Sequence, residues 1–550
     1  MKTLPERTAW HPTSLLAVLA LWLATIGNLP FWMAIWKLPE TQGWGALATM
    51  GSLWLILLAL LVWFLCLWVW PRWLKFAGLA MLLTVTSSSY FMLTYGVVID
   101  SSMLANVAQT DVREVRDLLS WPMLAAVVIG VVLPGVWLWR QPVRAVSAKP
   151  LLVRQLGVAL LAFLVALGLF WMSFQDIASL TRNHKQLRYM INPFNSVYAL
   201  TRLAVGQATV AAQPLQVIGE DASLRMAPAS EASAPLVVVI LGETARAANF
   251  GLGGYARDTT PQLRQIQAQG DLVYFSDVKS CGTSTQASVP CMFSHLGKAA
   301  YEDSKARSES VLDVLQRAGL AVLWLDNQSG CKGVCDRVPN VATTALKVPE
   351  FCTSGECLDE VMLHELPQQL AALDPAKRAK GTVVVMHQMG SHGPAYYKRS
   401  PAAMKPFQPE CNSHALQNCP PEHIVNAYDN SILYTDHFIA KTVNWLQAQS
   451  RPTALIYVSD HGESLGEKGL YLHGMPYSLA PKEQLHVPML VWLSKPLQRE
   501  RNWRMDCLQA QSAKALSHDH LFHSMLGLSQ VSTRLAKPEL DLFAACSAGR

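Results

Sequence analysis

The sequence predicts a chain with two parts: an N-terminal bundle of five transmembrane helices and a C-terminal α/β domain built on a mostly parallel sheet. Of the 550 residues 51% are hydrophobic, and the apolar excess is concentrated at the N-terminal end. From Leu236 onward, short apolar runs alternate with longer helical patterns. Ten of the eleven cysteines follow the last long apolar stretch, which indicates that the C-terminal part lies in an oxidising compartment.

The apolar excess falls into five stretches. Each holds about 20 residues, the length that an α-helix needs to cross the hydrocarbon core of a bilayer. They cover residues 14–36, 46–69, 74–97, 121–139 and 153–173. A cleaved signal peptide is the alternative for the first stretch, but four more spans follow it and no small-residue cleavage site stands out.

Basic residues set the orientation of the five predicted spans. They gather in the loop between spans 2 and 3 and in the loop between spans 4 and 5, and such loops face the cytoplasm. These residues are Arg72, Lys75, Arg140, Arg144, Lys149 and Arg154. The chain from Phe174 onward is therefore predicted outside the cell membrane. The net charge of +6 is modest and lies largely in these loops, so no nucleic-acid partner is expected.

The even set of ten cysteines after the last span predicts five disulfides. Proximity in the sequence suggests four pairs, and the two remaining cysteines then pair with each other. The predicted pairs are Cys281 with Cys291, Cys331 with Cys335, Cys352 with Cys357, Cys411 with Cys419, and Cys507 with Cys546. A cysteine zinc site is the alternative interpretation, but the irregular spacings do not favour it.

The chain thus divides into a transmembrane domain over residues 1–173, bridging helices and a linker over 174–235, and an α/β domain over 236–550. Residues 174–205 have a helical and partly amphipathic pattern, and residues 206–235 are rich in Ala, Pro, Ser and Gln. The second segment is therefore expected to connect the two domains along the membrane face.

Polar groups follow most of the predicted strands directly. The strands are expected at Leu236 to Leu241, Ala321 to Leu325, Thr382 to Met386, Ala454 to Val458 and Met489 to Leu493. After them come Gly242-Glu243-Thr244, Asp326-Asn327, His387 to His392, Ser459-Asp460-His461 and Ser494. Ligands of open α/β sheets bind beyond the carboxyl ends of the strands. Four of these five segments carry groups suited to a metal or a phosphate.

Asp460 and His461 leave one strand side by side, and Glu243 follows another. Carboxylate oxygens and imidazole nitrogens are ligands that zinc accepts. A helix cap is the alternative for any one of the carboxylates, but their repetition at several strand ends favours a metal site. Three loop histidines are further candidates, with a backbone-bonded loop histidine as the alternative for each: His387, His392 and His473.

The hydroxyl-rich segment Ser280-Cys281-Gly282-Thr283-Ser284-Thr285 is the candidate source of a nucleophile. A hydroxyl is a weak nucleophile unless a base or a metal activates it, and bound zinc lowers the pKa of an oxygen ligand. Position alone does not choose among Thr283, Ser284, Thr285 and Ser288. A capped helix N-terminus without any chemistry is the alternative.

These motifs resemble those of the lipid A phosphoethanolamine transferases, including the mobilised colistin resistance enzymes, within the alkaline phosphatase and sulfatase superfamily. The resemblance is nearly full length and the combination of motifs is specific. The motifs are Tyr95 to Asp100, Gly242 to Arg246, Cys281 to Thr285, Ser288 to Phe293, Cys331 to Gly333, Gly390 to Pro394 and Ser459 to Glu467. One departure is Gln328, where relatives carry asparagine or aspartate.

The resemblance implies a role for each candidate residue. Thr285 carries the phosphoethanolamine. The tightly bound zinc is held by Glu243, Thr285, Asp460 and His461. His392 and His473 meet the phosphate or a second, weaker zinc. The ethanolamine group is bound by Asn106, Thr110 and Glu114 in the loop after the third span, and by Ser329 and Lys332 in the α/β domain.

The implied enzyme is a monomer in the bacterial inner membrane with its catalytic domain in the periplasm. Zinc-activated Thr285 takes phosphoethanolamine from the donor phosphatidylethanolamine and then passes it to a phosphate of lipid A in lipopolysaccharide. The modification lowers the negative surface charge and confers resistance to polymyxins such as colistin. Three other interpretations are a lipoteichoic-acid-synthase-like glycerophosphate transferase, a sulfatase, and a membrane sensor with a degenerate domain. The dense disulfides speak against the first, the missing Cys-x-Pro-x-Arg segment against the second, and the complete set of site residues against the third.

Overall fold

The computed structural model describes residues 9–38, 41, 44–109, 115, 118–211, 213–226, 228–304, 306–353 and 355–547. The chain forms two compact units, a helical unit and an α/β unit. The helical unit comprises Met1–Leu104 and Leu119–Leu203, and the α/β unit comprises Ala105–Leu118 and Ala204–Arg550.

Five helical spans in the described residues are long and apolar enough to cross a membrane, as the sequence predicts. They are Pro12–Trp36, Leu47–Trp68, Leu74–Tyr95, Trp121–Arg140 and Ala148–Met172. The helices and helical turns of this part of the chain are α1 Pro12–Ala24, η1 Ile26–Asn28, α2 Leu29–Trp36, α3 Trp44–Trp68, α4 Leu74–Tyr95, α5 Ser101–Gln109, α7 Trp121–Val127, η3 Val128–Val132, α8 Leu133–Arg140, α9 Ala148–Met172, α10 Phe174–Asn183, η4 Lys185–Met190 and α11 Phe194–Ala211. The amphipathic stretch after the fifth span is helical, and α11 continues to Ala211.

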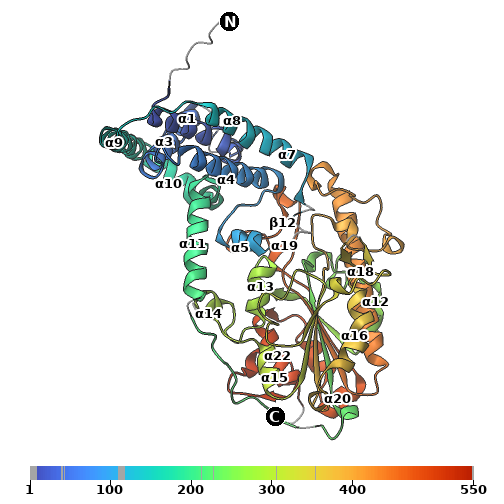
Figure 1. Cartoon of the computed structure of the whole chain (residues 1–550). Helices are drawn as coiled ribbons and strands as arrows, with labels where there is room; N and C mark the ends of the chain where they lie inside the picture. The colour runs from blue at the N-terminus through green and yellow to red at the C-terminus, as the bar shows by residue number, and fades with distance from the viewer. Residues whose placement is uncertain are drawn as a thin grey trace. The chain divides into compact units, whose positions relative to one another are not determined.

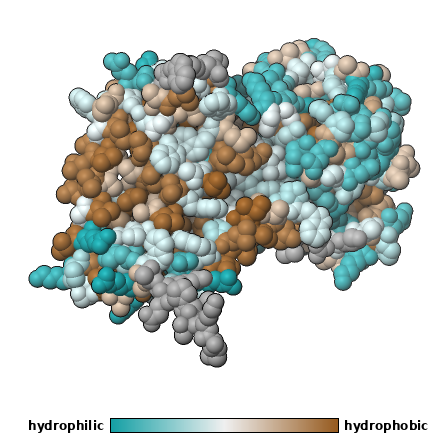
Figure 2. All heavy atoms as spheres, turned by 90° about the horizontal axis from the view of Figure 1, so that it is seen from above, coloured by the Kyte–Doolittle hydropathy of each residue, from teal (hydrophilic) through white to brown (hydrophobic). Residues whose placement is uncertain are grey.

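The helical unit exposes much of its apolar surface. Leu160 and Leu161 on α9 are 60% and 64% exposed. Figure 2 shows apolar side chains gathered over a broad part of the surface. Such a surface is stable in contact with lipid tails, which are as apolar as leucine.

The polar side chain of Asn28 lies inside the helical unit and bonds to backbone groups. The Nδ2 atom of Asn28 donates hydrogen bonds to the carbonyls of Leu23 and Asn192, at 2.8 and 2.7 Å. Its Oδ1 atom accepts from the backbone N–H of Asn192 at 2.8 Å. Asn28 ends the short 3-10 turn η1 that interrupts the first span. The bond to Leu23 therefore pairs a carbonyl next to the interruption, and the two bonds to Asn192 pair backbone groups of the segment before α11.

In the described part of the α/β unit, seven strands form the central sheet. In spatial order they are β3 Leu272–Phe275, β13 Met489–Leu493, β10 Thr453–Ser459, β2 Leu236–Gly242, β9 Thr382–His387, β5 Ala321–Asp326 and β6 Asn340–Ala342. The five strands from β10 to β6 are parallel to one another. All residues of β2, β5, β9, β10 and β13 are buried, as expected of strands covered on both faces.

Helices cover both faces of this sheet (Figure 1). One core contains side chains of α12 Pro261–Ala268, α16 Glu360–Ala372 and α18 Pro421–Gln447. The other contains side chains of α13 Thr285–Met292, α15 Val311–Arg317 and α22 Asp519–Leu528. The remaining helices are α14 Lys298–Asp303, α17 Pro375–Arg378, α19 Lys482–Leu485, α20 Lys495–Arg501 and α21 Met505–Ala510. Four small ladders pair β1 Ser223–Leu224 with β15 Val531–Ser532, β4 Asp277–Lys279 with β14 Ala515–Ser517, β7 Cys352–Thr353 with β8 Glu356–Cys357, and β11 Ser464–Leu465 with β12 Tyr471–Leu472.

Strand β13 runs antiparallel to both of its neighbours, β10 and β3. Its carboxyl end, and with it Ser494, therefore lies at the opposite edge from the ends of β2, β5, β9 and β10. The prediction that Ser494 follows its strand at the ligand-binding edge is wrong for this reason. Ser494 instead caps α20, where its hydroxyl accepts from the backbone of Leu497. The segment before β13 lies at the site edge, where the carbonyls of Gln484 and Leu485 accept from Gly462 and Ser280.

Ten cysteines form five disulfides within the described residues. These are the five pairs expected from the sequence: Cys281–Cys291, Cys331–Cys335, Cys352–Cys357, Cys411–Cys419 and Cys507–Cys546. The first holds the segment that carries Thr285, and the second closes the loop that carries Lys332.

Candidate active site

The carboxyl ends of four neighbouring parallel strands bring the candidate residues together. Asp326 and His387 are the last residues of β5 and β9, and they face each other in the strand register. Glu243 and Asp460 directly follow β2 and β10, whose ends are also paired. The expectation that these strand ends meet at one edge is therefore confirmed for all four.

Glu243, Asp460 and His461 form a fully buried cluster of possible metal ligands. The Nε2 atom of His461 lies 3.3 Å from Glu243 Oε1 and 3.4 Å from Asp460 Oδ2. Among the described residues, neither of these two oxygens has a hydrogen-bond partner. The other ring nitrogen of His461 donates to the carbonyl of Gly462 at 2.9 Å, which leaves Nε2 facing the carboxylates. Unpaired buried carboxylate oxygens are costly unless a cation meets them.

The electrostatics of the cluster favour a positive charge at its centre. Burial opposes the ionisation of Glu243, but the neighbouring imidazoles, His461 foremost, lower the pKa of this carboxyl overall. Burial and the charge of Glu243 raise the pKa of Asp460. Burial also opposes protonation of His461, yet the two carboxylates raise the pKa of its imidazole. Two carboxylates around one imidazole nitrogen form a donor set that fits zinc, so these residues fit the metal that the sequence predicts.

Thr285 is the hydroxyl residue of its segment that points at this cluster. Its Oγ1 atom donates to Glu243 Oε2 at 2.9 Å and lies 3.5 Å from His461 Nε2. Thr283 donates to the carbonyl of Met475 instead, and the Ser288 hydroxyl accepts from Gly282. Ser284 is the N-cap residue of α13 and makes no side-chain cap bond. Geometry thus distinguishes residues among which position in the sequence does not choose.

His392 and His473 lie beside the cluster. The ring of His473 is 4.5 Å from that of His461 and 5.3 Å from that of His392, between centroids. His473 Nδ1 is held by Glu463 Oε2 at 3.1 Å, and the other oxygen of Glu463 accepts from Tyr396. Burial lowers the pKa of His392 to about 3, so this ring is neutral at physiological pH. Two imidazoles next to the cluster are suited to a phosphate oxygen or a second metal.

Ser329 and Lys332 lie together in the loop that follows β5. The Lys332 ammonium group donates to the Ser329 hydroxyl at 2.9 Å and to its carbonyl at 3.2 Å. Asn106 lies on α5, in a segment that groups with the α/β unit. Thr110 and Glu114 lie outside the described residues. The binding of ethanolamine by these five residues stays a prediction.

Two buried carboxylates near the site were not among the predicted residues. Glu463 lies within the recognised motif that begins at Ser459, and the antiparallel pairing of β11 with β12 brings it to His473. Asp359 accepts from Asn327 and from the backbones of Met389 and Gly390, and so fixes the loop before His392. Asp359 directly precedes a helix, where an aspartate ordinarily indicates a cap. Gly390 needs its missing side chain, because a Cβ atom there would lie 2.6 Å from the carbonyl of Glu243.

Comparison with known proteins identifies the family of this chain. The Sulfatase family model matches residues 235–531, and the model for the phosphoethanolamine transferases EptA/EptB matches residues 55–208. Phosphoethanolamine transferase EptA of Salmonella typhimurium is 42% identical over 473 residues, which are 84% of each chain. The chain belongs to the phosphoethanolamine transferase family. Phosphatidylethanolamine transferase Mcr-2 of Escherichia coli, 37% identical, covers 96% of this chain and 97% of its own.

The similarity to one solved structure covers both units of this chain. The integral membrane lipooligosaccharide phosphoethanolamine transferase A (EptA) from Neisseria meningitidis matches with a TM-score of 0.92 at 36% identity. The match covers 98% of this chain and 99% of that one. Both the predicted family and the predicted fold class, five spans followed by an alkaline phosphatase and sulfatase-like domain, are confirmed. The chain is an inner-membrane protein whose C-terminal domain lies in the periplasm.

Proposed function

We propose that this chain transfers phosphoethanolamine from phosphatidylethanolamine to a phosphate of lipid A, through a covalent intermediate on Thr285. The observation that carries the proposal is the 2.9 Å hydrogen bond from the Thr285 hydroxyl to Glu243 Oε2. It joins the nucleophile to a fully buried carboxylate whose other oxygen faces His461. A hydroxyl in such contact is activated for attack on phosphorus.

In the first half of the reaction, Thr285 Oγ1 attacks the phosphorus of phosphatidylethanolamine. The new bond joins phosphorus to the threonine oxygen, and the bond from phosphorus to the glycerol oxygen breaks. Glu243 Oε2 is the acceptor already bonded to the threonine hydroxyl, so it takes the proton. The diacylglycerol oxygen takes a proton from solvent as it leaves, and Glu243 keeps the threonine proton for the second half.

In the second half, a phosphate oxygen of lipid A attacks the phosphothreonine. The bond from phosphorus to Thr285 Oγ1 breaks, and the threonine oxygen recovers its proton from Glu243 Oε2. His392 and His473 lie beside the cluster and are suited to hold the phosphoryl oxygens in both halves. Glu463 fixes the ring of His473 in the orientation that this role requires.

Glu243, Asp460 and His461, together with Thr285, would hold one zinc ion tightly, and His392 with His473 a second, weaker one. When bound, zinc lowers the pKa of the threonine hydroxyl and stabilises negative charge on the phosphoryl oxygens. The donor headgroup would be bound by Ser329 and Lys332 and, on its ethanolamine side, by Asn106, Thr110 and Glu114. A carboxylate such as Glu114 is a suitable partner for an ammonium group.

Each of the three predicted segments of the chain has its own role in this proposal. Residues 1–173 anchor the chain, residues 174–235 connect, and residues 236–550 carry the chemistry. Both lipid substrates lie in a bilayer, which explains a catalytic domain tethered to spans. All proposed catalytic groups come from a single chain, which supports a monomer. Added ammonium groups reduce the negative charge of lipid A and thereby its attraction for cationic polymyxins such as colistin.

The experiment that tests this proposal compares Thr285→Ala with Thr442→Ala in the full chain. Thr442 is a buried threonine of α18 that bonds only within its helix in the described contacts. Mass spectrometry of lipid A from cells expressing each variant should find phosphoethanolamine with Thr442→Ala and none with Thr285→Ala. Intact-protein mass should show the covalent adduct on wild type and on Thr442→Ala, and not on Thr285→Ala. Lipid A modification that persists in Thr285→Ala would remove this residue from its proposed role.

A further inference from the structure

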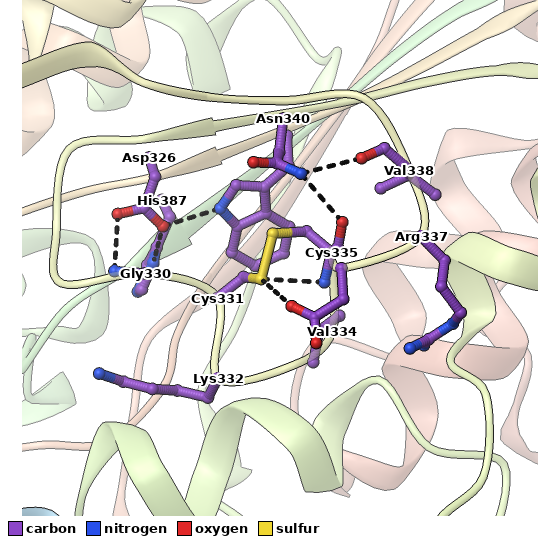
Figure 3. The surroundings of a disulfide bond; sticks show 12 residues. Asp326, Gly330, Cys331, Lys332, Val334, Cys335, Arg337, Val338, Asn340 and His387 are labelled. Carbon is purple, nitrogen blue, oxygen red and sulfur yellow. Dashed lines mark hydrogen bonds and ion pairs between the residues drawn. A yellow bond between two sulfur atoms is a disulfide. The ribbon is translucent and has the colours of Figure 1, made fainter. Parts of the chain in front are cut away.

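The buried pair of Asp326 and His387 has no part in the reaction as described so far. Asp326 Oδ2 lies 3.0 Å from His387 Nδ1, and it also accepts from the indole N–H of Trp324 at 2.8 Å. Figure 3 shows the two side chains next to each other, beside the loop of the Cys331–Cys335 disulfide. The ring of His387 packs edge-on against Trp324, with 5.5 Å between centroids. The imidazole is thus held on one side by a carboxylate and on another by an indole.

The second ring nitrogen of His387 faces the active site. Its Nε2 atom is fully buried, and among the described residues it has no hydrogen-bond partner. It lies 4.0 Å from Glu243 Oε2, the oxygen to which Thr285 donates. Glu243 therefore has neighbours on two sides: His461 at Oε1, and Thr285 with His387 at Oε2.

The first oxygen of Asp326 reaches a different part of the site. Asp326 Oδ1 accepts from the backbone N–H of Gly330 at 3.0 Å. Gly330 lies between Ser329 and Lys332, the residues proposed to bind the donor headgroup. One carboxylate thus contacts both the histidine behind Glu243 and the loop that carries these two side chains.

We propose that Asp326 and His387 form a positioning dyad that fixes the orientation of Glu243 and links it to the headgroup-binding loop. The inference rests on the proposed function, because it concerns the same site. Neither residue touches the reacting atoms, so both are positioning residues. Glu243 must present one oxygen to the metal cluster and the other to Thr285, and a free carboxylate would rotate between several orientations. A fully buried imidazole held 4.0 Å from Glu243 Oε2 favours one of them, because electrostatic interactions are strong where the local dielectric is low.

A purely structural role would be served better by apolar side chains. Burying a polar pair at this depth costs free energy, which hydrophobic residues of similar size would not cost. We therefore expect such a buried polar pair where it orients a side chain that takes part in the reaction, which here is Glu243. Side chains that contact the ligands of a metal, rather than the metal itself, change metal affinity or activity by about 10- to 100-fold when they are removed.

The test uses the full chain purified in detergent, with phosphatidylethanolamine as donor. His387→Ala should lower kcat about 10- to 100-fold while KM stays within about twofold. His387→Gln, which keeps a nitrogen near Glu243, should recover part of the loss. Asp326→Asn should lower kcat and also raise KM, because it weakens the anchor of Gly330. His523→Gln is the matched control, since His523 is a buried histidine of α22 that bonds to the backbone of Lys537.

A second readout does not need turnover. In protein loaded with cobalt(II) in place of zinc, the visible absorption spectrum reports the geometry of the metal ligands. It should change in His387→Ala and Asp326→Asn and stay unchanged in His523→Gln. A spectrum and a kcat that match wild type in both dyad variants would overturn the proposal, even if their melting temperatures fall. Absence of transfer by wild type would instead overturn the proposed function, and the spectra would still decide about the dyad.

Discussion

Apolar side chains of α9 in the helical unit are exposed, whereas those of the central sheet in the α/β unit are buried. In the helical unit Leu160 and Leu161 of α9 are more than half exposed, whereas in the α/β unit Ile456 of β10 is fully buried. The difference follows from the solvent, because water expels apolar side chains and lipid does not. Exposure of apolar residues in α9 is therefore a sign of a membrane surface rather than of poor packing.

Buried polar residues differ between the units in a corresponding way. In the helical unit the side chain of Asn28 bonds to backbone groups of Leu23 and Asn192. In the α/β unit Glu243 and Asp460 each keep one oxygen without a hydrogen-bond partner among the described residues. Satisfied polar groups stabilise a fold, and unsatisfied ones at strand ends indicate a ligand. In Glu243 and Asp460 the unpaired atoms are carboxylate oxygens that lie together at neighbouring strand ends, and this combination indicates a cation site.

The largest expected effect comes from the unsatisfied carboxylates. Glu243→Ala or Asp460→Ala should lower the transfer rate by at least about 100-fold, because even partners outside the first shell of a metal change activity by up to that factor. Zinc content, measured by elemental analysis of the purified chain, should fall in parallel. Glu309→Gln, at a buried carboxylate paired with Arg317, is the control. Full zinc occupancy at an undiminished rate would contradict the metal assignment.

Truncation of apolar side chains should separate the two kinds of apolar residue. Ile456→Ala in the sheet should cost about 2 to 5 kcal/mol, since it leaves a cavity in a packed core. Leu161→Ala should cost much less, because lipid tails fill the space that it leaves. Thermal unfolding of both variants in the same detergent checks the difference. Equal losses would mean that Leu161 packs against protein.

A substitution in the loop after the third span tests whether the N-terminal part of the chain contributes to substrate binding or only tethers the α/β unit to the membrane. Glu114→Ala in the full chain removes the proposed ammonium partner and keeps the tether. A hydrogen bond to a charged group contributes about 1.5 to 3 kcal/mol, so transfer to lipid A should fall about tenfold or more. The measurement is the initial rate with phosphatidylethanolamine in vesicles. A wild-type rate would leave the tether as the whole contribution of the membrane part.

The smallest expected effect is on stability, and it concerns the ion pair of Asp313 with Arg337 in the α/β unit. Burial opposes the ionisation of Asp313, but two hydrogen bonds from Arg337 and those from Ser310 lower the pKa of its carboxyl. Its unfolded pKa is about 3.9. Its contribution to stability is therefore present above about pH 5 and is lost as the pH falls through the lower folded pKa.

Asp313→Asn should consequently reduce the free energy of unfolding at neutral pH and have less effect as the pH approaches about 3. Denaturant unfolding of wild type and variant at several pH values measures this difference. A difference that stays constant over the whole range would show that the charge of Asp313 does not contribute.

The elements that the sequence predicts well are those whose signal is local. The five spans and the strands β2, β5, β9, β10 and β13 are continuous apolar runs, and each run is visible without knowledge of its neighbours. The direction of β13 is not local, because it depends on which strands lie beside it, and so Ser494 was misplaced. The short strands β3 and β6 lack a run of sufficient length. Disulfide pairs were predictable because four of the five join cysteines no more than ten residues apart.

The residues of the candidate site also divide into those with a local signal in the sequence and those without one. Glu243, Asp460 and His461 were predictable because each lies within three residues of the end of an apolar run. The choice of Thr285 from the residues alone was not, since it depends on a hydrogen bond to a residue 42 positions away. The contact between Asp326 and His387 joins residues 61 positions apart, and neither residue signals the other.

The reversed direction of β13 limits where this chain can gain or lose residues. Because the strand enters the sheet at the site edge, the few residues before it accept hydrogen bonds from three separate loops: the carbonyls of Gln484, Leu485 and His486 bond to Gly462, Ser280 and Ala247. An insertion of one residue there would shift together the loop that carries His461, the segment before Thr285 and the loop after Glu243. At the other end of the same strand, the loops around α20 lie far from these bonds and can vary in length without changing the chemistry.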